Sequence, residues 1–277
     1  MPISRRDALK RLAGALAAGS VAPESARIEA SSRLDRIGLQ LYTVRTEMQK
    51  SVEATLARVA EIGYLEVEFA GYYDRTPAQI AALLNQTGLT SPAAHIGFDV
   101  MRSAWDRALD GALAIGHRYV VVPSIPPAER RSAEAYRRIA DAFNRAGEAA
   151  RAKGLAFAYH NHDFEFEAMD GTTGYDILIE ACDPAVVRME LDLYWISRAG
   201  KDPVTYVRSQ PGRFPLVHVK DMTADRSMAD VGAGTIDFAG IFAAAAGSIR
   251  HYFVEHDRPA DPFASITSSY GYLSRLR

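Results

Sequence analysis

The sequence predicts a single α/β domain built as a (β/α)8 barrel. From Ile37 onward, short apolar runs alternate with amphipathic stretches of helix length, which indicates a parallel sheet covered by helices. This unit repeats eight times without a linker-like break, and eight units favour a closed barrel over an open sheet. The segment 42–45 after the first expected strand contains no glycine, so it is unlike the dinucleotide-binding loop of an open sheet.

Local signals define the individual units. Ser51 is placed to cap the first helix and Gly63 to end it, and Pro77 lies in the first turn of the second helix, where proline is tolerated. The expected strands are 37–42, 65–69, 90–96, 119–123, 155–161, 187–193, 214–220 and 251–255. The expected helices are 52–62, 77–85, 100–115, 133–153, 175–181, 203–208, 238–246 and 262–276.

The composition excludes several classes of protein. The chain has 277 residues, 48% of them hydrophobic, and this is enough to bury a substantial core. The formal net charge is −2 and no block of like charge runs long, so we expect neither nucleic acid nor a membrane surface as a partner. Cys182 is the only cysteine, which excludes an intramolecular disulfide and a thiolate zinc cluster.

Residues 1–30 carry the pattern of an export signal. Segment 4–10 reads Ser-Arg-Arg-Asp-Ala-Leu-Lys and precedes an apolar run of small residues, 12–22, that is too short to span a bilayer. It resembles a twin-arginine signal, with Ala8 where the motif has phenylalanine. We therefore expect a signal segment at 1–30, a barrel domain at 36–277 and a periplasmic protein. The alternative, an amphipathic N-terminal helix, predicts a cytoplasmic one.

The stretch 159–163, Tyr-His-Asn-His-Asp, follows the apolar run 155–158. Residues i and i+2 of a strand point to the same side, so His160 and His162 are expected to project together. A pair of imidazoles at the C-terminal end of a strand suits a metal or acid/base site, and the alternative is two ordinary polar residues at a strand edge.

Other strands deliver similar groups, and barrel enzymes place their chemistry at the C-terminal ends of the strands. The polar and aromatic residues near those ends are Gln40, Tyr42, Glu68, His95, His160, His162, Asp192, Trp195, His218, Lys220 and Glu255. Mixed imidazole and carboxylate ligands suit Mn²⁺, Fe²⁺, Co²⁺ or Zn²⁺ better than Ca²⁺ or Mg²⁺. We therefore expect one divalent metal ion at this end of the barrel.

Several short motifs resemble the sugar phosphate isomerase/epimerase group, whose members share the xylose isomerase-like TIM barrel. These are Gly-Leu-Gln-Leu-Tyr at 38–42, Val-Glu at 67–68, Glu-Leu-Asp at 190–192, His-Val-Lys-Asp at 218–221 and Val-Glu at 254–255. The resemblance implies Asp192, His218 and Glu255 as metal ligands. His160 takes the fourth ligand position, where many members carry glutamate, and leaves His162 to face the substrate. The Tyr-His-x-His run is similar to that of inosose dehydratase.

The resemblance also implies roles for the remaining residues, each with an alternative. Glu255 or a histidine is the expected base, and Lys220 orients a substrate oxygen or else pairs with Asp221 or Glu190. Gln40 and Tyr42 are expected to bind substrate. So are Glu68, His95 and Trp195, although Glu68 and His95 could instead support the ligands and the aromatic rings could merely pack. Asp192 could cap a loop and His218 could be a hydrogen-bonded core residue. Glu165 and Glu167 are expected to face solvent.

Three functions follow from this set of residues. The first is a metal-dependent sugar isomerase or epimerase that removes a proton beside a carbonyl and passes through an enediolate. The second is a keto-sugar lyase or dehydratase, for example an enzyme that catalyses β-elimination from 3-keto-glycosides. This function is considered because His160 stands where the epimerases carry one glutamate of a symmetric pair. The third is a non-catalytic sugar-binding barrel. An exported enzyme is expected to act on unphosphorylated sugars. The nearest candidate for a phosphate cradle is Gly-Ala-Gly-Thr at 232–235, and short glycine runs of this kind are weak evidence, so we expect an unphosphorylated sugar or glycoside. The oligomeric state is open, and a homodimer is compatible with the sequence.

Overall fold

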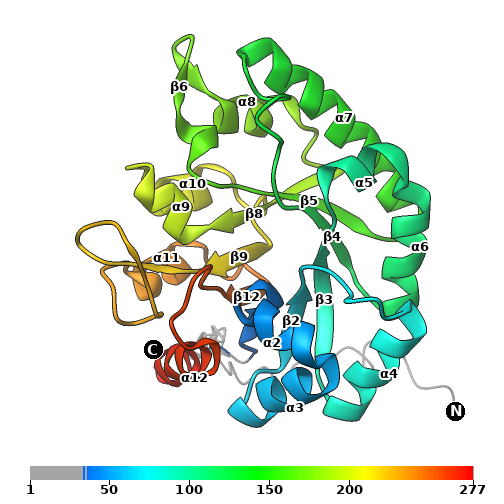
Figure 1. Cartoon of the computed structure of the whole chain (residues 1–277). Coiled ribbons are helices and arrows are strands. Elements are labelled where there is room, and N and C mark those ends of the chain that lie inside the picture. Colours follow the sequence, from blue (N-terminus) through cyan, green and yellow to red (C-terminus); the bar gives the residue numbers. More distant parts are fainter. Residues whose placement is uncertain (1–33, 35, 277) are drawn as a thin grey trace, which may run out of the picture. The chain divides into compact units, whose positions relative to one another are not determined.

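The structure is a computed structural model that describes residues 34 and 36–276, so the predicted signal segment at 1–30 lies outside the described residues. Eight parallel strands form a closed barrel (Figure 1). These strands are β1 Gly38–Gln40, β2 Glu66–Phe69, β3 Thr90–His95, β4 Tyr119–Val122, β5 Ala156–His160, β8 Val187–Asp192, β9 Leu216–Val219 and β12 His251–Val254. Around the barrel they follow the order β1-β12-β9-β8-β5-β4-β3-β2, so the last strand pairs with the first. The predicted fold class is confirmed.

Helices follow the strands along the chain and surround the barrel (Figure 1). One helix of each unit lies near its predicted position: α3 Val52–Ile62, α4 Pro77–Thr87, α6 Trp105–Ile115, α7 Ala133–Ala152, α8 Gly174–Ala181, α10 Pro203–Ser209, α11 Phe238–Ala244 and α12 Pro262–Leu273. Short elements decorate the loops: η1 Leu41–Val44, α2 Arg45–Lys50, α5 Phe98–Ser103, η2 Phe164–Phe166, β6 Ala168–Met169, β7 Thr172–Thr173, α9 Leu193–Arg198, β10 Asp221–Met222 and β11 Met228–Ala229. No described helix is both long and apolar enough to cross a membrane.

Three element boundaries differ from the sequence prediction for identifiable reasons. The first strand ends at Gln40, because its side chain accepts the Tyr42 N–H and so caps η1. The helix expected at 100–115 is two helices, since Ala104 has φ −146° and interrupts the helical backbone. Helix α9 directly follows β8, because the Asp192 carboxylate caps it by accepting the Trp195 N–H. These capping contacts bring Tyr42 and Trp195 close to the strand ends.

A small apolar cluster, separate from the larger core, is formed by residues of five barrel strands: Ala93, Val121, Ala158, Leu216 and Phe253. Side chains alternate between the two faces of each strand, so these residues fill the barrel interior while their neighbours pack under the helices. A Cβ atom at Gly38 would lie 2.5 Å from the Phe253 ring, so the close approach of that ring requires glycine. Phe253 pairs in register with His218. The apolar interior thus ends at a polar layer.

Candidate active site and metal centre

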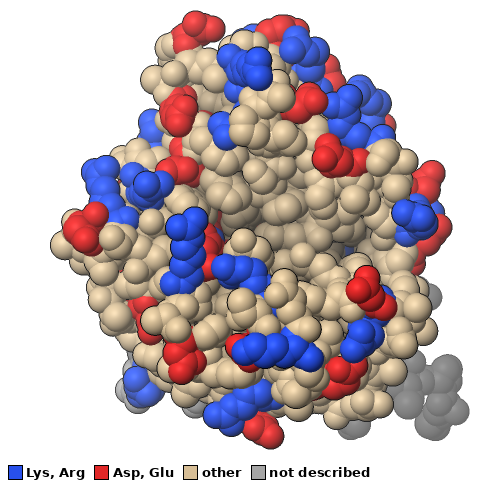
Figure 2. Space-filling view, viewed as in Figure 1, with Lys and Arg blue, Asp and Glu red and all other residues tan. Residues whose placement is uncertain are grey.

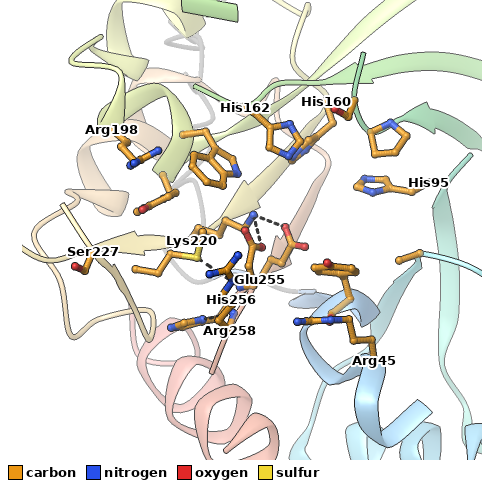
Figure 3. A pocket seen from close by; sticks show the side chains of 18 of the residues that line it. Arg45, His95, His160, His162, Arg198, Lys220, Ser227, Glu255, His256 and Arg258 are labelled. Carbon is orange, nitrogen blue, oxygen red and sulfur yellow. Dashed lines mark hydrogen bonds and ion pairs between the residues drawn. The ribbon is translucent and has the colours of Figure 1, made fainter. Parts of the chain in front are cut away.

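A cavity of about 950 Å³ opens at the C-terminal end of the barrel strands. Seven of the residues selected from the sequence line it: Tyr42, His95, His160, His162, Trp195, Lys220 and Glu255. In Figure 3 the three histidines lie on one side of the cavity, and Lys220 and Glu255 lie on the other. The four remaining candidates, Gln40, Glu68, Asp192 and His218, are fully buried and do not line it.

Gln40 and Glu68, expected to bind substrate, instead bind each other. The Gln40 amide donates to Glu68 Oε2 at 2.7 Å, and its carbonyl oxygen accepts the Tyr42 N–H at 3.0 Å. Glu68 Oε2 also lies 2.8 Å from His218 Nε2. Both polar groups of the Gln40 side chain are therefore occupied below the cavity, and these two residues are placed to hold His218.

Asp192, His218 and Glu255 form a compact group of metal-ligand type. Each offers a ligand atom within 4.8 Å of the others. His218 Nδ1 lies 2.7 Å from Glu255 Oε2 and 3.8 Å from Asp192 Oδ2, and His160 Nε2 lies 3.9 Å from Asp192 Oδ2. Two ligands bound at about 2.1 Å to one ion are at most about 4.2 Å apart, so small adjustments suffice. The set fits a transition-metal ion or zinc.

A second group lies beside the first and shares His218 with it. It consists of His95, His160, Glu190 and His218, again with ligand atoms within 4.8 Å of one another. Glu190 Oε2 lies 2.9 Å from His95 Nε2 and 3.1 Å from His218 Nε2. Burial lowers the pKa of His218, but Glu190 and Glu255 outweigh it and raise that pKa well above its usual value. Carboxylates on the far nitrogen of a ligand histidine fix its orientation.

Glu190 was not among the site residues predicted from the sequence. The signal was available, because Glu190 lies two residues before Asp192 on β8 and therefore points to the same side of the strand. A residue further from the strand end is expected to belong to the apolar interior, and Glu190 departs from this expectation.

Lys220 is buried among three carboxylates. Its Nζ lies 2.8 Å from Glu255 (Figure 3), 2.8 Å from Asp257 and 3.2 Å from Asp192. Burial lowers the pKa of Lys220, but the three carboxylates raise it by more than burial lowers it. The net pKa lies above its usual value, so the side chain is an ammonium at neutral pH. The expected alternative partners were wrong: Asp221 accepts backbone N–H groups of the loop that follows, and Glu190 contacts histidines.

His160 and His162 lie side by side, as the strand alternation predicted, with ring centroids 5.0 Å apart. Burial lowers the pKa of His162 to about 3 and that of His160 well below its usual value, so both imidazoles are neutral at pH 7. Trp195 lies 5.4 Å from the His162 ring. Within the described part of the chain, His162 Nδ1 and Trp195 Nε1 are buried without a hydrogen-bond partner. Both residues line the cavity.

Glu165 was expected to face solvent, and this prediction was wrong. Its side chain is fully buried, whereas Glu167 is exposed as predicted. The Glu165 carboxylate accepts hydrogen bonds from the Tyr159 hydroxyl and, at 2.8 Å, from the His162 N–H. The helix η2 turns the chain back toward β5, and Glu165 thereby fixes the backbone that carries His162.

The burial of Glu165 has an expected effect on stability. Burial raises the pKa of its carboxyl to about 7, against an ordinary value of 4.5. The folded state therefore keeps a proton that the unfolded chain loses, so stability falls as the pH rises from about 4.5 to 7, by a total of about 3 kcal/mol. Glu165→Gln cannot ionise and should lack this fall. Urea unfolding at pH 5 and pH 8 checks it, with the exposed Glu167→Gln as control. Equal pH dependence in the parent and Glu165→Gln would contradict the prediction.

Comparisons with known proteins agree with this architecture. Residues 56–256 match the sequence profile of the xylose isomerase-like TIM barrel. An inosose dehydratase of Geobacillus kaustophilus is 23% identical over 267 aligned positions, covering 80% of this chain and 85% of the relative. The solved structure of a sugar phosphate isomerase/epimerase from Parabacteroides distasonis has a TM-score of 0.77 and 26% identity, and the match covers 92% of this chain and 100% of that one.

A further solved structure, of the IOLI protein with a zinc atom, has a TM-score of 0.70 and 14% identity. That match covers 87% of this chain and 99% of the other. At this identity the likeness concerns the fold alone.

Proposed function

Because this chain belongs to the xylose isomerase-like TIM barrel family, we propose that it is a carbon–oxygen lyase that acts on a keto-sugar or keto-glycoside. It removes a proton from the carbon beside the ketone, and the oxygen substituent on the next carbon then leaves. The inosose dehydratase relative, whose name denotes loss of water from a keto-cyclitol, supports elimination rather than rearrangement.

The observation that carries this proposal is the placement of the acidic groups. Glu255 and Asp257, the carboxylates that line the cavity in the described part of the chain, both follow β12. The opposite side presents His160 and His162 (Figure 3). An epimerase has to remove a proton from one face of a carbon and return one to the other. A syn elimination needs a base and an acid that act on the same side.

Glu255 and Lys220 supply these two groups. The Glu255 carboxylate takes the proton from the carbon beside the ketone. A carbon–carbon double bond forms, and the electron pair of the broken carbon–oxygen bond stays with the leaving oxygen. Lys220, whose Nζ lies 2.8 Å from Glu255 Oε2, gives that oxygen a proton. The unpartnered nitrogen atoms of His162 and Trp195 hold sugar hydroxyl groups.

We assign the metal position to His160, Asp192, His218 and Glu255, which provide two imidazoles and two carboxylates. This donor set suits Mn²⁺, Fe²⁺, Co²⁺ or Zn²⁺. When bound, such an ion supplies positive charge that polarises the ketone and stabilises the enediolate. Glu68, Glu190 and Gln40 position His218 from below.

Isomerisation or epimerisation is the second candidate. The sugar phosphate isomerase/epimerase structure favours it, and so does His162, which lies across the cavity from Glu255 and could exchange a proton with the opposite face of the sugar.

The test is to incubate the metal-loaded protein with a 3-keto-glycoside in D₂O and follow the reaction by NMR. The proposal predicts release of the aglycone together with formation of an unsaturated ketone. Exchange of the proton beside the ketone without release would favour isomerisation or epimerisation. A protein that binds the glycoside but shows neither exchange nor release would instead be a non-catalytic sugar-binding barrel.

A further inference from the structure

The rim of the cavity carries more arginine side chains than acidic residues can neutralise. Arg45, Arg198, Arg226 and Arg258 all line it. Arg198 forms an ion pair with Asp163. Among the described residues the other three form no ion pair with an acidic side chain within 4 Å. The acidic residues that line the cavity, Glu255 and Asp257, are themselves paired with Lys220.

These three arginines belong to one side of the barrel mouth. Arg45 follows η1 after β1, Arg226 lies in the hairpin between β10 and β11 after β9, and Arg258 follows β12. Strands β9, β12 and β1 are neighbours in the barrel. In the described part of the chain, the side of the cavity after β2, β3 and β4 has no arginine or lysine in its lining, and its one titratable lining residue is His95, which is paired with buried Glu190. The rest of this side is lined by Ala70, Gly97, Pro123 and Ser124. Figure 2 shows the same asymmetry, with blue groups bordering the hollow on its lower left and tan atoms forming its upper right wall.

Local contacts hold the side chain of Arg45 and the backbone of Arg226 in place. The guanidinium of Arg45 lies 4.1 Å from the centroid of the Tyr42 ring and donates to the Tyr42 carbonyl oxygen at 2.8 Å. Arg226 has φ +65°, a left-handed conformation that costs an arginine more than it costs a glycine or asparagine. The Tyr194 hydroxyl donates to the Arg226 carbonyl oxygen at 3.1 Å and keeps the hairpin over the cavity. An arginine held at a strained position suggests a use for its side chain.

The glycine loop after β9 does not supply the alternative anion site considered from the sequence. The N–H groups of Gly232 and Gly234 both donate to Asp221 Oδ2 at 2.9 Å. These donors are already used by a carboxylate of the chain itself. Recognition of an external anion therefore falls to the arginine side chains at the rim.

We propose that the substrate carries an anionic substituent, a carboxylate, phosphate or sulfate, and that Arg45, Arg226 and Arg258 bind it at the rim. Arginine is the preferred partner of such groups because its donors match their oxygen atoms in pairs. The proposal rests on the proposed function for the sugar part of the substrate. The carboxylates around Lys220 repel a second anion, so the charged substituent points outward and the ketone points toward the floor of the cavity.

The test is equilibrium binding by calorimetry with four ligands: glucose, glucuronate, glucose 6-phosphate and glucose 6-sulfate. We expect at least one anionic sugar to bind about 10-fold more tightly than glucose, and the preference to shrink as NaCl is raised. The double variant Arg226→Gln/Arg258→Gln should lose most of the preference without weakening glucose binding. Arg107→Gln, an exposed position on α6 outside the cavity, should keep it.

The anionic sugar that binds most tightly identifies the group. Equal affinity for glucose and all three anions in the parent protein, or an unchanged preference in the double variant, would overturn the proposal. Because binding requires no turnover, the result is separable from the elimination test. An anion preference without any reaction would contradict the proposed lyase activity and leave this subsite standing.

Discussion

His218→Ala is expected to lose both bound divalent metal and activity. His218 belongs to both groups of candidate ligands, and its two ring nitrogens face Glu255 at 2.7 Å and Glu68 at 2.8 Å. Removing a group that only supports a metal ligand typically weakens metal binding or activity about 10- to 100-fold, so removing a direct ligand should cost at least about 100-fold. Metal analysis after dialysis against Mn²⁺ or Zn²⁺, together with the rate of aglycone release, measures both effects.

Alanine at this position also leaves buried carboxylates without a partner, which costs about 3–5 kcal/mol of stability. His218→Gln is therefore needed as a second variant, because its amide retains a donor. The matched control is His251→Gln. His251 lies at the start of β12, at the other end of the barrel, where it contacts buried Glu66 at 2.7 Å. A folded His218→Gln protein with full metal content and parental turnover would remove His218 from the metal site.

Lys220→Met is expected to lower turnover about 10²- to 10⁴-fold, the usual contribution of a positioned acid, while metal content is retained. Methionine has a similar length but carries no proton for the leaving oxygen. The ammonium lies between Asp192 and Glu255 at 3.2 and 2.8 Å, so its loss also leaves these carboxylates freer to bind a cation. Turnover and metal content, measured on the same metal-loaded sample, separate the two effects.

Lys220→Arg should remain impaired, because a planar guanidinium does not replace a compact ammonium in this position. Lys153→Met, at the C-terminal end of α7, is the control. A loss of metal in proportion to the loss of activity would show that Lys220 only maintains the ligand geometry.

The fold and the gathering of the candidate ligands at one end of the barrel could be predicted from the sequence, because both depend on periodic rules. Neighbouring parallel strands end at the same edge of the barrel, so Asp192, His218 and Glu255 had to lie near one another. A different periodic rule, the alternation of side chains along a strand, predicted that His160 and His162 lie on the same side. These predictions need only the strand positions, which the apolar runs indicate.

The remaining features depend on loops and on side-chain directions. Asp257, which pairs with Lys220, lies beyond the end of β12, where alternation no longer applies. Gln40 turns away from the cavity because its side-chain carbonyl oxygen caps η1, which begins at Leu41. Glu165 is buried because η2 folds back onto Tyr159. The arginine rim combines three loops that are distant in sequence, so no local pattern could have revealed it.

The role of Glu255 as the base is tested most directly by the rate at which Glu255→Gln exchanges the proton beside the ketone of a 3-keto-glycoside with D₂O. Glutamine keeps the size of the side chain but cannot accept that proton. We expect measurable exchange and aglycone release in the parent protein, and loss of both in Glu255→Gln while the glycoside still binds. Exchange at the parental rate in Glu255→Gln would contradict the assignment of Glu255 as the base and, with it, elimination from the β12 side of the cavity.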